Sequence, residues 1–117
     1  MLPWQRALKE RIDGEVRFDP TSKILYSTDA SMYQIEPVGV VYPQHADDVA
    51  ETIRVAYEFG IPVTPRGGGT SLAGQSVGKS IHIDTSRHMN ALLEVNEKEH
   101  WARVQPGVVL DELNALL

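Results

Sequence analysis

The sequence contains no cysteine. This absence excludes a disulfide framework, a thiolate metal site and a cysteine nucleophile within the chain, and it fits a reducing compartment. Basic residues are also in the minority, 11 against 16 acidic, and the resulting net charge of −5 argues against nucleic acid as a partner. No apolar run approaches the roughly 18 residues of a membrane span, and the first twelve residues lack a signal-peptide core. We therefore expect a cytoplasmic protein, at most peripheral to the inner membrane.

What the sequence does contain is the composition of a globular protein, with 42% hydrophobic and 23% charged residues. A chain of 117 residues suffices for one small domain or for a piece of a larger one. It ends on the apolar pair Leu116-Leu117 without a helix stop signal, whereas natural termini are more often polar and frayed. This pattern predicts that residues 1–117 are the N-terminal part of a truncated domain. The apolar surface so exposed predicts self-association of the chain.

A parallel βαβ unit is the clearest structural prediction. The apolar run 38–42 is typical of a strand buried on both faces. Asp47 and Asp48 favour a helix start, the helix extends over about 46–59, and Gly60 ends it. The spacing of its apolar residues predicts the buried face, which comprises Val49, Ile53, Ala56 and Tyr57. An extended segment at 62–65 follows, and we expect it to be the parallel neighbour of 38–42.

Further elements flank this unit. Trp4, Leu8 and Ile12 recur at helical spacing. Segments 16–18 and 24–26 fit either short strands or packed loop. Segment 81–84 predicts a strand, and 92–95 with 101–104 predict an antiparallel hairpin. The spacing of Val109, Leu110, Leu113 and Leu116 suits a final helix. Together these elements predict an α+β fold, a small parallel βαβ unit followed by antiparallel strands.

The segment between 62–65 and 81–84 carries the chemistry. Glycines at 67, 68, 69 and 74 are costly to order, and they are useful where backbone must approach a ligand closely. Successive N–H groups without side chains form a concave nest for phosphate oxygens. Thr70 and Ser71 add hydroxyl donors, and Arg66 can offset ligand charge. The segment predicts a pyrophosphate-binding loop, the alternative being a plain flexible turn.

Two common phosphate-binding motifs do not match. The dinucleotide pattern G-x-G-x-x-G needs glycine where Leu72 stands, and the Walker pattern over Gly69 to Ser76 has Gln75 in the lysine position. Without that lysine the β- and γ-phosphates lose their main charge partner. A nucleotide- or phosphate-binding module without redox function, including a P-loop-type hydrolase, remains the alternative function.

No other residues predict a metal or catalytic site. The four histidines, His45, His82, His88 and His100, lack metal-binding spacing. Asp47 and Asp48 are better explained as helix-start residues than as a paired acid and base. Residues 84–87 are better explained as a strand end with a capping turn than as a catalytic cluster.

Segment 65–75 closely resembles the flavin pyrophosphate loop of the FAD-linked oxidase family. Its fold is of the p-cresol methylhydroxylase (PCMH) and vanillyl-alcohol oxidase type, and its members include D-lactate dehydrogenases, glycolate oxidase and 2-hydroxyglutarate dehydrogenases. Segments 29–33, 40–43, 47–49 and 104–108 share the resemblance. It is much more specific than a lone G-x-G-x-x-G pattern.

The resemblance implies a non-covalent FAD site, because Thr70 stands where some relatives carry a flavin-linking histidine. The implied cofactor-binding residues are Arg66, Gly67, Gly68, Gly69, Thr70, Ser71, Gly74, Gln75, Ser76, Pro106 and Gly107. The resemblance further implies an enzyme that passes hydride from a small 2-hydroxy acid to FAD and electrons onward to an acceptor or carrier. Catalytic residues would lie outside this chain. Long bacterial members carry an iron–sulfur region downstream, which implies such clusters after residue 117.

Overall fold

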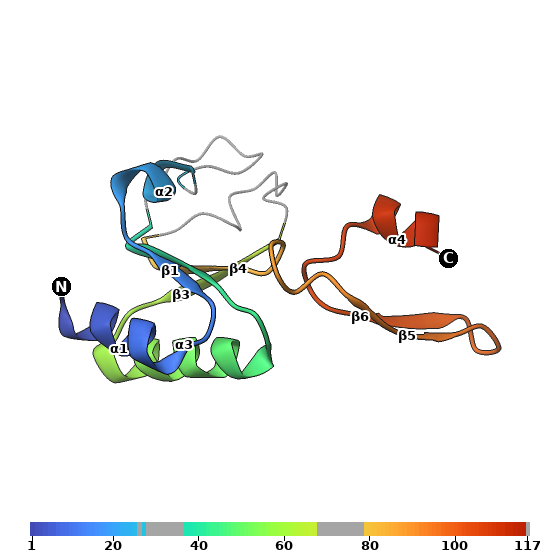
Figure 1. Cartoon of the computed structure of the whole chain (residues 1–117), viewed down its shortest axis with the longest axis horizontal. Helices are drawn as coiled ribbons and strands as arrows, with labels where there is room; N and C mark the ends of the chain where they lie inside the picture. Colours follow the sequence, from blue (N-terminus) through green and yellow to red (C-terminus); the bar gives the residue numbers. More distant parts are fainter. Residues whose placement is uncertain (26, 28–36, 68–78, 117) are drawn as a thin grey trace.

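The computed structural model describes residues 1–25, 27, 37–67 and 79–116. A four-stranded sheet forms the body, from β1 (Glu15–Arg17), β2 (Gly39–Tyr42), β3 (Val63–Arg66) and β4 (Ile81–Asp84), in the order β1-β2-β4-β3 (Figure 1). Strands β2, β4 and β3 run parallel, and β1 pairs antiparallel with β2 at one edge. The predicted mixture of parallel and antiparallel strands is confirmed.

The predicted adjacency of the two βαβ strands is wrong. Strands β2 and β3 are parallel, but β4 lies between them and hydrogen-bonds to both. The composition of β3 explains its place at the edge, because Pro65 has no N–H to donate and prolines are confined to sheet edges. In contrast, every residue of β4 is buried, as suits a central strand.

Helices α1 (Pro3–Arg11) and α3 (Ala46–Phe59) lie together on one side of the sheet, and α2 (Pro20–Leu25) lies on the other (Figure 1). The core between sheet and helices is built from Leu8, Ile12, Val41, Val55, Ala56 and Ile81. Helix α2 replaces the strand or loop expected at 24–26. Its start had a local signal, since Asp19 accepts a hydrogen bond from the Ser22 amide (3.0 Å) and Pro20 opens the first turn. None of the helices in the described part of the chain is long and apolar enough to cross a membrane.

Helix α3 has the predicted bounds, and its buried face includes the predicted Ala56 but otherwise differs from the prediction. Gly60 ends it in the left-handed conformation (φ 67°), as expected. The buried residues are Asp48, Thr52, Val55 and Ala56, whereas the predicted Tyr57 is 89% exposed and Ile53 51% exposed. Thr52 can be buried because its hydroxyl donates to the Asp48 carbonyl (2.7 Å). Asp48 is buried because backbone N–H groups surround its carboxylate, as described below.

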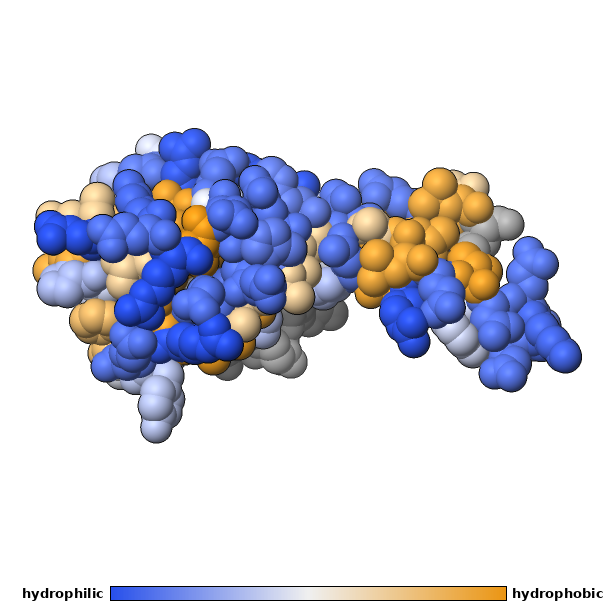
Figure 2. Space-filling view, turned by 60° about the horizontal axis from the view of Figure 1, so that its bottom comes forward, coloured by the Kyte–Doolittle hydropathy of each residue, from blue (hydrophilic) through white to orange (hydrophobic). Residues whose placement is uncertain are grey.

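Strands β5 (Leu92–Asn96) and β6 (Trp101–Val104) pair antiparallel, which confirms the predicted hairpin. With α4 (Leu110–Leu116) they form an arm that projects from the body (Figure 1). Figure 2 shows apolar side chains at the surface of this arm. The large exposed ones are Leu93, Val95, Trp101, Val104, Val109, Leu110 and Leu116. A two-stranded hairpin is marginally stable by itself, so we expect a partner to cover this surface. Self-association stays a prediction.

Candidate cofactor-binding site

The carboxyl ends of β3 and β4 lie side by side. Arg66 and Asp84 are register partners at the last position of the two strands. Just beyond them, the Thr85 amide donates to the Arg66 carbonyl (3.1 Å) and the Thr85 hydroxyl makes a longer contact with the same oxygen (3.5 Å). Parallel sheets bind their ligands outside the carboxyl ends of strands. Gly67, the first glycine of the predicted loop, directly follows β3. It therefore lies at the carboxyl edge of the sheet, where a ligand is expected.

A cleft of about 380 Å³ opens at this edge, between α3 and the sheet. Its walls are mainly apolar, with Arg66 as the one charged lining residue among those the structure describes. The lining residues are Val49, Ile53, Val63, Pro65, Arg66, Gly67, Ile83, Thr85 and Pro106. Val63, Pro65 and Ile83 project from the same face of the sheet, since Pro65 and Ile83 are register partners. Ile53, mispredicted as core, thus lines the cleft instead.

The structure brings two distant predicted segments together at this cleft. A Cβ atom on Gly67 would lie 3.9 Å from the Pro106 carbonyl oxygen, so these two residues face each other. Gly107 follows, buried, with its amide donating to the Met89 carbonyl (2.8 Å). Arg66, Gly67, Pro106 and Gly107 are thus neighbours in space. The other predicted cofactor residues, Gly68, Gly69, Thr70, Ser71, Gly74, Gln75 and Ser76, lie outside the described residues.

The described part of the cleft fits a cofactor with an apolar portion and a phosphate portion. Apolar walls with few polar groups are typical of cofactor sites. The guanidinium of Arg66 is a suitable partner for phosphate oxygens. Gly67 lines the cleft, and among the described residues beyond its chain neighbours the nearest atom to an added Cβ is the Pro106 oxygen at 3.9 Å. The packing of the described residues does not require a glycine at this position, so its lack of a side chain leaves room for a ligand.

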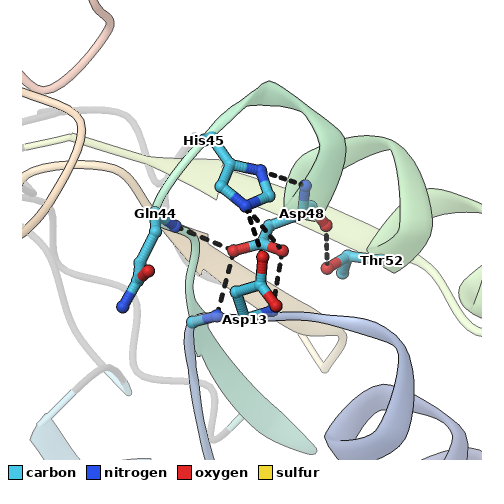
Figure 3. Close-up of polar contacts among 6 residues, drawn as sticks. Asp13, Gln44, His45, Asp48 and Thr52 are labelled. Carbon is cyan, nitrogen blue, oxygen red and sulfur yellow. Dashed lines mark hydrogen bonds and ion pairs between the residues drawn. The ribbon is translucent and has the colours of Figure 1, made fainter.

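A polar cluster missed by the sequence analysis anchors the N-terminus of α3 (Figure 3). The Asp48 carboxylate, 2% exposed, accepts hydrogen bonds from the amides of Asp13 (2.8 Å), Gly14 (2.9 Å) and Gln44 (3.0 Å). These amides belong to the turn after α1 and to the segment after β2. One carboxylate therefore ties both segments to α3, the helix that forms one wall of the cleft.

His45 completes this cluster. It is the N-cap of α3, and in its neutral form its Nδ1 accepts from the Asp48 amide (3.3 Å) while its Nε2–H donates to Asp13 Oδ2 (2.8 Å). Protonation adds a positive charge to the contact with Asp13 and removes the Nδ1 acceptor, but the Asp48 amide keeps its bond to the His45 carbonyl (3.1 Å). Asp13, His45 and Asp48 could offer a metal three ligand atoms within 4.8 Å of one another. However, the Asp48 carboxylate is already occupied by three N–H donors, so the cluster is explained as a structural clamp.

This clamp predicts a pH-dependent contribution to stability. The hydrogen bond to Asp13, with a smaller effect from the charge of Asp48, raises the pKa of His45 above its ordinary value. A raised pKa in the folded state means that the stabilisation is complete below the unfolded value and is lost as pH rises through the folded value. Wild type should therefore lose more stability between about pH 6 and about pH 8.5 than His45→Asn, which keeps an N-cap acceptor. Urea unfolding at both pH values measures this difference. Asp13→Asn should show the same weaker dependence of stability on pH as His45→Asn. An equal change in stability between the two pH values in all three proteins would contradict the prediction.

The turn after β4 has the structural role predicted for it. Asp84 Oδ1 accepts hydrogen bonds from the Ser86 amide (2.8 Å) and hydroxyl (2.6 Å), as in a capping turn. Arg87, in the same turn, places its guanidinium 4.0 Å from the centre of the Tyr42 ring and 3.5 Å from Glu15. The turn is therefore attached to both β2 and β1, beside the cleft.

The fold and the cleft together define a class of protein. The family model described as FAD binding domain matches residues 37–117, more than half of the chain. The chain belongs to this family of FAD-binding domains, and the predicted family resemblance is confirmed.

Single relatives indicate which members of the family this chain resembles. D-2-hydroxyglutarate dehydrogenase from Pseudomonas putida is 47% identical over 110 residues, which cover 89% of this chain and 11% of that enzyme. Among solved structures, an alkyldihydroxyacetonephosphate synthase matches all of this chain and 27% of its own, with a TM-score of 0.85 at 24% identity. p-Cresol methylhydroxylase matches 97% of this chain and 23% of its own, with a TM-score of 0.77 at 14% identity. These structural matches confirm the PCMH-type fold.

Proposed function

We propose that this chain supplies part of the FAD site of a dehydrogenase that oxidises a small 2-hydroxy acid to the 2-oxo acid. The observation that carries the proposal is the cleft at the carboxyl ends of β3 and β4, where Arg66, Gly67 and Pro106 meet. Membership of the FAD-binding family supplies the cofactor, and the 47% identical D-2-hydroxyglutarate dehydrogenase supplies the substrate class.

The chain's own residues would bind and orient the cofactor. FAD, when bound, supplies the capacity to accept hydride from the substrate. Gly67 and, by resemblance, Gly68 to Ser71 would offer backbone and hydroxyl donors to the pyrophosphate, with Gly74, Gln75 and Ser76 continuing the wall. The Arg66 guanidinium would offset the phosphate charge. Helix α3 would shield one side of the cleft from water, and its clamp at Asp48 would keep that wall in place.

Substrate binding and proton transfer would belong to other parts of the protein. The chain spans 11% of the length of the Pseudomonas putida relative, and no described residue in the cleft is a histidine or carboxylate suited to act as base. We propose that residues 1–117 are the N-terminal portion of the FAD-binding domain. The same proposal includes an electron acceptor that reoxidises the flavin.

The proposal is tested with the purified full-length protein. We expect flavin absorbance bands, release of FAD on denaturation, and reduction of an artificial electron acceptor when D-2-hydroxyglutarate, D-lactate or glycolate is added. Comparing the three acids identifies the substrate. A colourless protein that hydrolyses ATP would contradict the proposal and favour the nucleotide-hydrolase alternative.

A further inference from the structure

Gly107 lies at a backbone crossing that admits no side chain. A Cβ atom on this residue would lie 2.0 Å from the Thr85 carbonyl oxygen and 2.6 Å from the Met89 carbonyl oxygen. Both neighbours are backbone atoms, which cannot rotate away as a side chain can. The Gly107 amide also donates to Met89 (2.8 Å), so the crossing is held by a hydrogen bond as well as by close packing. This glycine is therefore required by the chain's own packing, whereas no atom of the described residues requires a glycine at position 67.

The crossing connects the two sides of the cleft. On one side, the Thr85 amide donates to the Arg66 carbonyl (3.1 Å), which ties the turn to the end of β3. Within the turn, the Met89 amide donates to the Thr85 carbonyl (3.1 Å). On the other side, Gly107 rests on that turn and is bonded directly to Pro106. A short path of backbone contacts thus determines how far the Pro106 carbonyl lies from Gly67.

We infer that Gly107 is a positioning residue of the cofactor site and acts through Pro106. By allowing the crossing over the 85–89 turn, it fixes Pro106 opposite Gly67 and so sets the width of the cleft mouth. The family resemblance assigns Gly107 a contact with the cofactor; the structure assigns it a place behind the wall. This inference rests on the proposed FAD site and deepens it.

Gln105 secures the same segment from its other end. Its amide donates to the Ala91 carbonyl (3.0 Å), and its side-chain oxygen accepts from the Ala91 amide (3.0 Å). The Gln105 side chain thus closes the base of the arm without contacting the cleft, since it is absent from the lining residues. Its removal should loosen the Pro106 segment without the steric overlap that any substitution of Gly107 introduces.

The test measures FAD affinity and the absorbance spectrum of bound flavin in the full-length protein carrying Gly107→Ala. The matched control is Gly60→Ala at the C-terminal end of α3, where alanine is disfavoured by the backbone conformation (φ 67°) and no atom of the described residues, apart from chain neighbours and the helix's own backbone, lies within 4 Å of the new Cβ. We expect Gly107→Ala to weaken FAD binding at least about tenfold and to shift the flavin bands. We expect Gly60→Ala to lower thermal stability with unchanged flavin affinity and spectrum.

Gln105→Ala keeps the test valid if Gly107→Ala does not fold. It should retain wild-type circular dichroism and weaken FAD binding about three- to tenfold. Wild-type affinity and spectrum in Gln105→Ala or in folded Gly107→Ala would overturn the inference. An equal loss of flavin in Gly60→Ala would also overturn it, because general destabilisation would then explain the effect. A wild-type protein without FAD would instead overturn the proposed function itself.

Discussion

In the full-length protein, Gly67→Val is expected to lower FAD affinity by at least about a hundredfold while leaving the fold intact. The described part of the chain has room for the side chain, since its nearest atom to a Cβ at this position, chain neighbours aside, is the Pro106 oxygen at 3.9 Å. The branched side chain would nevertheless stand in the mouth of the cleft, where the backbone of residue 67 is proposed to contact the cofactor. This variant should therefore keep the fold of the wild type while losing most of its flavin affinity.

Flavin content per mole of purified protein and circular dichroism together measure this separation. Gly67→Ala is the graded control, because its smaller side chain should weaken binding less than valine does. Gly68→Val, in the adjoining loop position outside the described residues, is predicted to lose FAD as well. A Gly67→Val protein with normal flavin content would remove the cleft from consideration as the FAD site.

Asp48→Ala should lower the free energy of unfolding by about 3–4 kcal/mol. Its buried carboxylate accepts from the amides of Asp13, Gly14 and Gln44, and the alanine variant leaves those donors without their acceptor. A buried unsatisfied donor carries the full cost of its desolvation. The clamp also joins α1, β2 and α3, so its loss should affect the whole body.

Asp47→Ala is the matched control for this prediction. Asp47 is also an aspartate in the first turn of α3, but it is exposed, so its loss should remove only a helix-dipole term of about 0.5 kcal/mol. Urea unfolding followed by far-UV circular dichroism compares the two variants. Similar losses in both would show that Asp48 acts through the helix dipole alone, contrary to the role assigned to its hydrogen bonds.

Local sequence determined much of the secondary structure. The apolar run at 38–42 predicted β2, and Gly60 predicted the end of α3, because burial on both faces and a left-handed cap are properties of short segments. The hairpin at 92–104 and the strand at 81–84 followed from the same kind of pattern. The glycine-rich segment predicted the family, and Arg66 and Gly67 were placed in the site from that resemblance.

Only the tertiary structure decided how these elements combine. The position of β4 between β2 and β3 depends on hydrogen bonds between strands far apart in sequence, and Pro65 was the sole local hint of it. The buried face of α3 includes Asp48 and Thr52, which apolar spacing could not predict because their burial depends on distant backbone donors and on a local hydroxyl bond. Likewise, the glycine at 107 is explained by backbone at Thr85 and Met89. Patterns of polarity along the chain predict which segments are regular, whereas long-range hydrogen bonds and steric fit decide which residues meet at the cleft.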